Sequence, residues 1–278
     1  MPFVTVGREN TGDIRIHYED HGAGPAVVLI HGYLADLQSW EKQEPALLDA
    51  GYRVVCYDRR GSGFSSRPAT GYDYDTLAAD LSVLLAELDV QNVVLVATGC
   101  GTGEVIRYLG TRGQHRIRAV ALLAPMPPFP SRPDATQDGA GPGFFGRFLA
   151  ELTADRPAAV KTFLDRYYNL DLLGGSQVSD QAWQNSFHVA IRVSPAAALG
   201  CAAAWREDFR KDLARISVPV LIVQGTEDRI MQPSTAGHRL AEALPRARLV
   251  AIPAGPHAII WTHAAEVNQA LLGFLRAL

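Results

Sequence analysis

Residues 93–104 read VVLVATGCGTGE, in which a run of apolar, mostly β-branched residues leads into a glycine-rich turn. β-Branched residues favour an extended strand, and the sequence after the turn is typical of a helix. In many enzymes a turn of this kind, between a strand and a helix, holds a nucleophilic serine between two glycines. Here the middle position is glycine. The stretch therefore predicts a catalytic turn that has no hydroxyl at its apex.

The apex of this turn can be located from the size of the neighbouring residues. At a strained apex with φ > 0, the residues two positions before and two positions after face each other closely and must be small. Centring the turn on Gly99 places Ala97 and Gly101 at those positions. Centring it on Cys100 would place two β-branched threonines there, and centring it on the preceding threonine is no better. We therefore expect Gly99 to be the apex.

Short apolar runs recur along the rest of the chain and predict a sheet. Each run is continuously apolar, which is typical of a strand buried on both faces. The runs cover residues 26–30, 53–57, 92–97, 118–124, 219–224 and 248–252. Between several of them the spacing is helical, as for the leucines of residues 77–88, where Asp73 or Asp75 would cap the helix. This alternation predicts an α/β fold with a doubly wound, mostly parallel sheet, preceded by a hairpin over residues 3–18.

Residues 126–211 break the alternation because they contain no convincing strand. Helical stretches there carry many aromatic residues, namely Phe148, Phe163, Tyr167, Tyr168, Trp183, Phe187 and Trp205. An insertion between two strands suits a cap over the carboxyl ends of the sheet, where open α/β sheets bind ligands. We therefore expect a core of residues 1–125 and 212–278 and a helical cap of residues 126–211. The alternative is that these helices simply pack on the core.

Composition excludes some classes of function. A formal net charge of -3 on 278 residues gives no reason to expect a nucleic-acid or anionic-membrane partner. The N-terminal residues do not resemble a signal peptide, and no apolar run approaches the roughly 20 residues of a membrane span. The three cysteines are widely spaced and lack a CxxC pair, which favours reduced thiols, a cytoplasmic protein and no metal site. The oligomeric state cannot be read from the sequence.

Five stretches, in order, resemble the cofactor-free bacterial haloperoxidase (perhydrolase/esterase) group of α/β-hydrolases. They are IHGYLADLQSWE (30–41), YDRRGSGFSSRP (57–68), LVATGCGTGEVIRYLG (95–110), VPVLIVQGTEDRIMQP (218–233) and IPAGPHAIIWTH (252–263). The resemblance implies an α/β-hydrolase fold with a helical cap and no cofactor. It covers nearly all of the core, with glycine where members of the group have serine, and it is weaker in the cap.

The resemblance also implies roles for particular residues. Asp228, in preference to the adjacent Glu227, would be the acid, and His257 the base, in the order nucleophile, acid, histidine that this fold uses. The backbone N–H groups of Tyr33 and Cys100 would form the oxyanion hole. A Cys100 thiolate or a neighbouring threonine hydroxyl could replace the serine, but in this frame the cysteine side chain should point away from the base. His31 and residues 58–60 are expected to be structural.

The expected pocket is apolar and aromatic, and it would bind a small or medium carbonyl substrate. Its predicted lining residues are Tyr33, Phe144, Phe145, Trp183 and Ile259. Three functions agree with a glycine at position 99. The first is serine-independent chemistry in which His257, held by Asp228, acts as the base for direct hydrolysis, a lyase step or a cyclisation. The second is an ester, lactone or lactam hydrolase, or a perhydrolase, inactivated by replacement of serine. The third is a non-catalytic ligand-binding protein.

Overall fold

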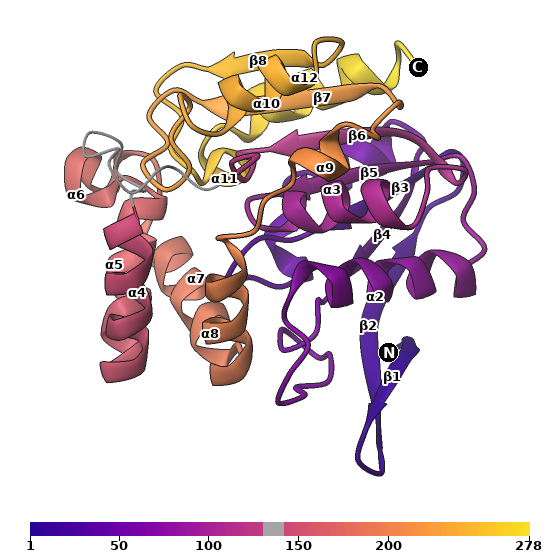
Figure 1. Cartoon of the computed structure of the whole chain (residues 1–278). Helices are drawn as coiled ribbons and strands as arrows, with labels where there is room; N and C mark the ends of the chain where they lie inside the picture. Colours follow the sequence, from indigo (N-terminus) through magenta and orange to yellow (C-terminus); the bar gives the residue numbers. More distant parts are fainter. Residues whose placement is uncertain (130–141) are drawn as a thin grey trace.

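The computed structural model describes residues 1–129 and 142–278, and it describes no side chains at residues 142–145 and 173–174. An eight-stranded sheet runs through the molecule in the order β1-β2-β4-β3-β5-β6-β7-β8 (Figure 1). Its strands are β1 (Phe3–Glu9), β2 (Gly12–His21), β3 (Ala26–Ile30), β4 (Arg53–Tyr57), β5 (Val93–Thr98), β6 (Ile117–Leu123), β7 (Val220–Gly225) and β8 (Arg248–Ile252). Strands β3 to β8 pair in parallel, whereas β1 pairs antiparallel with β2 and β2 with β4. The predicted doubly wound, mostly parallel sheet with an initial hairpin is confirmed.

One strand departs from the predicted burial pattern. The run at residues 248–252 was expected to be buried on both faces, but in β8 only Ile252 is fully buried and Leu249 is 37% exposed. The reason is its position at the edge of the sheet, where it has one neighbour, β7. An apolar run does not show how many strands flank it.

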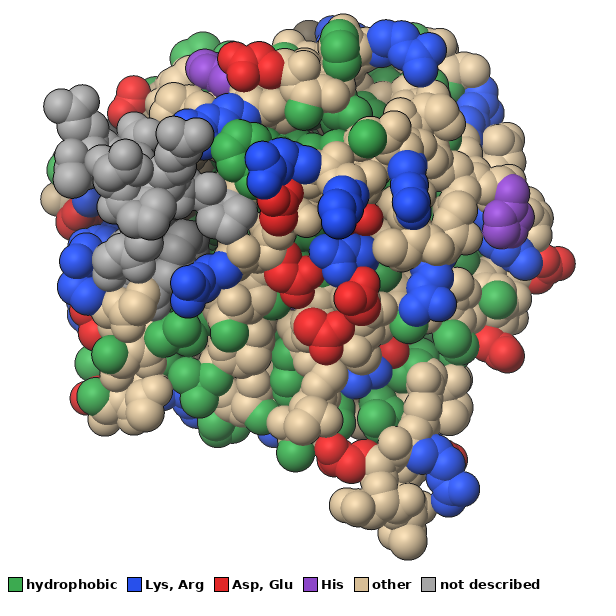
Figure 2. Space-filling model, viewed as in Figure 1, with side chains coloured by type: hydrophobic (Ala, Val, Ile, Leu, Met, Phe, Trp, Pro, Cys, Tyr) green, Lys and Arg blue, Asp and Glu red, His purple; other side chains and the backbone are tan. Residues whose placement is uncertain are grey.

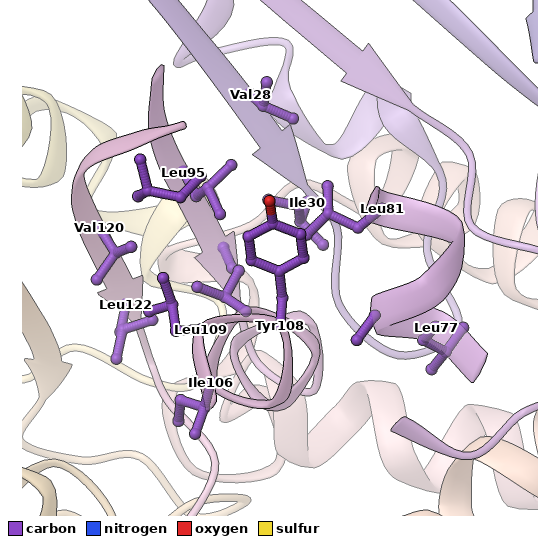
Figure 3. Packing of buried hydrophobic residues seen from close by; sticks show 14 of the residues in the cluster. Val28, Ile30, Leu77, Leu81, Leu95, Ile106, Tyr108, Leu109, Val120 and Leu122 are labelled. Atoms are coloured by element: carbon purple, nitrogen blue, oxygen red, sulfur yellow. The ribbon is translucent and has the colours of Figure 1, made fainter. Parts of the chain in front are cut away.

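Helices cover both faces of the sheet. The helices of the core are η1 (Leu37–Trp40), α1 (Glu44–Asp49), α2 (Tyr74–Glu87), α3 (Gly101–Thr111), α9 (Arg210–Leu213), α10 (Gly237–Ala243), α11 (Ile259–Thr262) and α12 (Ala264–Leu275). Because strand side chains alternate between faces, Val28 and Ile30 of β3 pack with α2 and α3, while Val27 and Leu29 pack with α1 and α12. Figure 3 shows the first of these layers, in which α2 and α3 side chains gather around Val28, Ile30 and Leu95.

Helix α2 begins where its capping residue predicts. The Asp73 side chain accepts a hydrogen bond from the Thr76 N–H, so Asp73, of the two candidate aspartates, is the N-cap. Four of the five leucines that predicted this helix, at positions 77, 81, 84 and 85, are buried against the sheet, and the fifth, Leu88, is partly buried at the C-cap. Helical spacing therefore predicted both the element and its buried face.

A second group of helices lies between β6 and β7 in the chain and to one side of the sheet in Figure 1. It comprises α4 (Pro142–Ala154), α5 (Arg156–Tyr167), α6 (Leu170–Leu173), η2 (Gly174–Ser176), α7 (Asp180–Arg192) and α8 (Pro195–Ala204). We call these elements the cap helices. Their apolar side chains share a separate cluster, in which Phe148, Phe163 and Trp205 pack with Leu34 and Cys100 from the core.

Acidic and basic side chains are intermixed on the face of the molecule shown in Figure 2. Arg107 of α3, for example, forms ion pairs with Asp75, Glu207 and Asp212. No single helix among the described residues is long and apolar enough to cross a membrane. Helices α7 and α8, bent by 95° relative to each other, reach that length and apolar composition only when taken together. Within residues 1–129 and 142–278, no group of three His, Cys, Asp or Glu side chains is arranged to hold a metal ion.

Candidate active site

The carboxyl ends of four parallel strands, two on each side of β6, bring the predicted catalytic residues together. Tyr33 follows β3, Gly99 follows β5, Asp228 follows β7 and His257 follows β8. In a parallel sheet these ends lie along one edge, so residues far apart in sequence meet there. The cap helices pack over the same edge, because Leu34 and Cys100 share an apolar cluster with them.

Gly99 lies at the apex of a sharp turn between β5 and α3. Its φ is +52°, a conformation that glycine adopts without strain. The Gly99 N–H donates to the Leu123 carbonyl of β6 at 3.0 Å, which anchors the turn to the sheet. A Cβ atom built on Gly99 would lie 3.1 Å from Nε2 of His257. The position that a nucleophilic side chain would occupy therefore faces the histidine.

The small residue at position 101 is needed for a reason other than the predicted one. We expected Gly101 to face Ala97 across the turn. A Cβ on Gly101 would instead meet the carbonyl oxygens of His31 and Ile30 at 2.6 and 2.9 Å, so the end of β3 imposes the limit. The inferred apex is right, but the close neighbour belongs to another strand that the local sequence does not reveal.

Asp228 is held by four hydrogen bonds. Its Oδ1 accepts from the N–H groups of Ile230 and Met231 at 2.9 and 2.8 Å. Its Oδ2 accepts from Nε2 of Gln224 at 3.1 Å and pairs with Nδ1 of His257 at 2.7 Å. Because this carboxylate acts as an acceptor throughout, Nδ1 of His257 is the donor. That leaves the lone pair of Nε2 directed at the space beside Gly99.

Two backbone N–H groups are free to donate hydrogen bonds to an oxyanion. Within the described part of the chain, neither the Tyr33 nor the Cys100 N–H donates a hydrogen bond. Cys100 is the N-cap of α3, where N–H groups lack helical partners and the helix dipole favours negative charge. Gly32 approaches within 3.8 Å of the Cβ position on Gly99, so the two turns adjoin.

The Cys100 thiol does not face the histidine. Its Sγ accepts a hydrogen bond from Nη1 of Arg59 at 3.0 Å, in the interior. Burial raises the pKa of this thiol, which disfavours the thiolate that a nucleophile requires. The Thr102 hydroxyl donates to the Gly99 carbonyl at 2.7 Å and accepts from the Met126 N–H at 2.9 Å, so it too is engaged.

His31 fixes the turn that precedes Tyr33. Burial, followed by the charge of Arg59, lowers its pKa to about 4, so the ring is neutral near pH 7. Its Nδ1 bonds the Gly32 carbonyl at 2.9 Å, and its Nε2 accepts the Arg59 N–H at 2.9 Å. The Arg59 side chain pairs with Glu104 at 2.7 Å. These contacts agree with the structural roles expected of His31 and of residues 58–60.

A small cavity adjoins Gly99 and His257, and we call it the inner cavity. It has a volume of about 300 Å³. This is enough for water, since one molecule takes up about 30 Å³ in the liquid. The lining residues are Gly32, Tyr33, Ala35, Ser39, Thr98, Gly99, Phe163, Tyr167, His257 and Ile260.

A larger groove of about 600 Å³, here the outer groove, adjoins the inner cavity and lies between core and cap. The two share six lining residues: Tyr33, Ala35, Ser39, Phe163, Tyr167 and Ile260. The outer groove is further lined by Leu34, Asp36, Gln38, Glu41, Leu164, Tyr168, Asn185, Ser186, Val189 and Trp261. Space for a substrate therefore extends from the histidine toward the surface.

The predicted lining residues are only partly brought together. Tyr33 lines both spaces, and its hydroxyl donates to the Ala198 carbonyl of the cap at 2.7 Å. Ile259 does not line them, because in α11 it is buried in the core while the next residue, Ile260, faces the cavity. Trp183 also does not line them, because it stacks on Phe187 of its own helix.

The remaining two predicted lining residues, Phe144 and Phe145, have side chains outside the described part of the structure.

Phe163 and Tyr167 of α5 line both spaces, although the sequence pattern predicted them only as aromatic residues of the cap. The Tyr167 ring meets the His257 ring edge to face at 5.4 Å. Burial raises the pKa of the Tyr167 hydroxyl, which keeps it neutral. An aromatic pair on one helix turn signals a buried face, but only the docking of α5 decides that this face covers the histidine.

Three comparisons bear on the identity of the chain. A family model described as "alpha/beta hydrolase fold" matches residues 25–264. The chain is 48% identical over 276 residues, 99% of this chain and all of the relative, to a Synechocystis protein named "Putative non-heme chloroperoxidase". It is 28% identical, over 98% of this chain and all of the relative, to a bifunctional esterase/perhydrolase from Acinetobacter calcoaceticus. Among solved structures, it matches a bromoperoxidase from Bacillus anthracis with a TM-score of 0.94 and 39% identity, over 99% of each chain.

Proposed function

This chain belongs to the α/β-hydrolase family and is an enzyme of that superfamily, and from this premise we propose that it acts on a small or medium carbonyl substrate without a serine nucleophile. His257 would be the acid–base residue and Asp228 would orient it. The observation that carries the proposal is the approach of His257 Nε2 to within 3.1 Å of the Cβ position on Gly99, at the wall of a cavity that can hold water.

Direct hydrolysis illustrates the proposed chemistry. Nε2 of His257 takes a proton from a water molecule in the inner cavity, and the water oxygen attacks the carbonyl carbon. The negative charge that develops on the carbonyl oxygen is met by the Tyr33 and Cys100 N–H groups. When the bond to the leaving group breaks, the protonated histidine returns its proton to the leaving oxygen. An ester and water thus give an acid and an alcohol, with no acyl-enzyme.

The same groups could serve a lyase or cyclase step. In that case Nε2 removes an acidic proton from the substrate itself, and the two N–H groups stabilise an enolate. The hydrogen bonds to Asp228 support either course, because they hold one ring orientation and stabilise the imidazolium that forms.

A second candidate is an ester, lactone or lactam hydrolase, or a perhydrolase, that has lost its serine at position 99. The similarity to a bifunctional esterase/perhydrolase favours it. Under this reading the pair of Asp228 and His257 is retained from a triad, and Gly99 is the one missing part.

Two substitutions at one position separate these candidates. Gly99→Ala fills the space beside Nε2 without adding a hydroxyl, and Gly99→Ser fills it with a nucleophile. Both carry the same backbone strain at φ +52°, so each controls for the folding of the other. Each would be assayed beside the wild-type protein on a panel of aryl esters and lactones.

If water is the nucleophile, the wild-type protein turns over a member of the panel and Gly99→Ala lowers that rate by at least about a hundredfold. An unchanged rate in Gly99→Ala contradicts the proposal. If the wild-type protein is inert and only Gly99→Ser gains activity, with an acyl adduct detected by mass spectrometry, the inactivated-hydrolase candidate is correct. Binding of a ligand with no conversion by either form would favour a non-catalytic role.

A further inference from the structure

The outer groove carries two carboxylates that form no ion pair with any cation among the described residues. Asp36 and Glu41, at the two ends of η1, are its only charged lining residues among those described. Neither carboxylate forms an ion pair within 4 Å in the described part of the chain. The Asp36 side chain accepts one hydrogen bond, from the Gln38 N–H at 3.1 Å.

Asp36 is held in an environment that disfavours its charge. Its side chain is part-buried, and burial, followed by the negative charge of Asp58, raises its pKa to about 6. Near pH 8 the carboxylate is ionised and lacks a counter-ion. A bound cation would remove this imbalance, because burial of a charge is costly unless an opposite charge accompanies it.

Among the described residues, Lys42 and Arg192 are basic side chains close to the groove, and each has contacts outside it. Nζ of Lys42 donates to the Trp261 carbonyl at 3.0 Å and lies over the Trp261 ring at 4.1 Å from its centroid. The guanidinium of Arg192 lies 5.9 Å from the Phe64 ring centroid, although it is near enough to Asp36 to oppose the rise in its pKa. Neither lines the groove.

Aromatic rings make up much of the remaining wall: Tyr33, Phe163, Tyr167, Tyr168 and Trp261. Aromatic faces attract cations through their quadrupole, and cages of such rings recognise quaternary ammonium groups. Lys42 already lies over the Trp261 ring, so the other four rings are the ones open to a ligand. Together with the part-buried Asp36 and the exposed Glu41, they favour an ammonium group in the groove over a carboxylate.

We propose that the outer groove binds an ammonium group at the far end of the substrate, so that cationic carbonyl compounds bind more tightly than neutral isosteres and carboxylates bind least. The groove adjoins the inner cavity through six shared residues, so one molecule can span both. The inner cavity would take a carbonyl with a short acyl end. Only the position of the carbonyl rests on the proposed function.

Binding of three ketones of matched length tests the proposal without requiring turnover. They are 5-(trimethylammonio)pentan-2-one, its neutral isostere 6,6-dimethylheptan-2-one, and the anion 5-oxohexanoate, none of which is a hydrolase substrate. Dissociation constants would be measured by calorimetry at pH 8 and low ionic strength. We expect the ammonium ketone to bind about tenfold more tightly than the isostere and the anion about tenfold less tightly. The difference should shrink in 1 M salt, where exposed charges are screened.

Asp36→Asn and Glu41→Gln remove the two charges singly and together. Asparagine is also a good N-cap, so the start of η1 is preserved. Glu87→Gln removes one charge from the exposed surface of α2, as each single variant does from the groove, and serves as the matched control for the single variants. The double variant should abolish the preference for the cation, and the control should keep it.

Equal binding of the three ketones, an unchanged order in the double variant, or failure of the ammonium ketone to bind at millimolar concentration would each overturn the proposal. The outcome is separable from the chemistry. If the predicted order holds while the enzyme cleaves no ester or lactone, the groove binds cations and the proposed hydrolysis is wrong. If esters are cleaved but the three ketones bind equally, the proposed hydrolysis is right and the proposed cation site is wrong.

Discussion

Among the described residues, two buried histidines each pair with an aspartate through Nδ1. The two pairs differ in the surroundings of the other ring nitrogen, Nε2. In one pair, Nδ1 of His257 lies 2.7 Å from Asp228, and Nε2 faces the inner cavity beside Gly99. In the other, Nδ1 of His17 lies 3.0 Å from Asp58, and both side chains are 1% exposed. Nε2 of His17 is buried with no partner among the described residues.

The surroundings explain this difference. The His17 ring lies between the rings of Phe3 and Phe64, at centroid distances of 5.4 and 5.3 Å. Asp58 accepts from the N–H groups of Leu37 and Phe64, each at 2.9 Å, so it joins β2 to two loops. Both rings are thus oriented by an aspartate, but only His257 has its second nitrogen open to a cavity, at the end of a strand.

The largest expected effect is on activity. His257→Ala should lower the rate of ester hydrolysis by about 10²–10⁴-fold, because it removes the general base. The free energy of unfolding should fall as well, because the buried Asp228 carboxylate loses its histidine and keeps three other hydrogen bonds. Steady-state rates with p-nitrophenyl acetate, normalised to folded protein by circular dichroism, provide the measurement. If His257→Ala keeps the wild-type rate, the pair of His257 and Asp228 has only a structural role, as the pair of His17 and Asp58 has.

The corresponding change in the other pair should act on stability. His17→Ala removes a buried ring and one of the hydrogen bonds to the Asp58 carboxylate, and we expect a loss of about 3–5 kcal/mol in the free energy of unfolding. Urea denaturation measures it. The rate per folded molecule should stay within about twofold of wild type. A loss of activity without a loss of stability would contradict the structural role.

His31 links the two regions, because it accepts the N–H of Arg59, beside Asp58, and shapes the turn before Tyr33. Its pKa falls from 6.5 to about 4 on folding, so the unfolded chain takes up its proton first. Stability from this group is complete above pH 6.5 and is lost as pH falls toward 4, by on the order of 3 kcal/mol. The difference in unfolding free energy between wild type and His31→Gln, which cannot titrate, should follow this course. A pH-independent difference would contradict it.

The smallest effect concerns the contact between core and cap. Tyr33→Phe removes the hydrogen bond from the hydroxyl to the Ala198 carbonyl but keeps the ring and the backbone N–H. We expect a loss of about 1 kcal/mol in stability and little change in kcat. Thermal denaturation and a steady-state assay give the two values. A large fall in kcat would mean that the hydroxyl, and not only the N–H, takes part in the reaction.

Local pattern predicted most of the core. Residues 26–30, 53–57 and 248–252 are strands with the predicted bounds, and the leucines of α2 are buried as expected. These features depend on neighbours in sequence, since alternation and helical spacing decide which face is apolar. The edge position of β8 was not predicted, because the number of flanking strands is a property of the whole sheet.

The lining of the cavity was predicted less well. Ile259 and Ile260 are chemically identical neighbours, and only the start of α11 decides that the second faces the cavity. Trp183 and Tyr167 are both aromatic cap residues, and only the docking of α5 places the second against His257. The side-chain orientation of adjacent helical residues differs by about 100°, so an error of one residue changes the face.

The sequence by itself determined that Gly99 stands at the apex of a turn, since only small neighbours and a residue tolerant of positive φ fit there. It also determined the alternation of strands and helices that builds the sheet. The tertiary structure alone decided that His257 faces the side of Gly99 where a side chain would stand, whereas His17, which also bonds an aspartate, packs against aromatic rings. The physical reason is that hydrogen bonding orients an imidazole locally, whereas its access to a substrate depends on how distant segments pack around it.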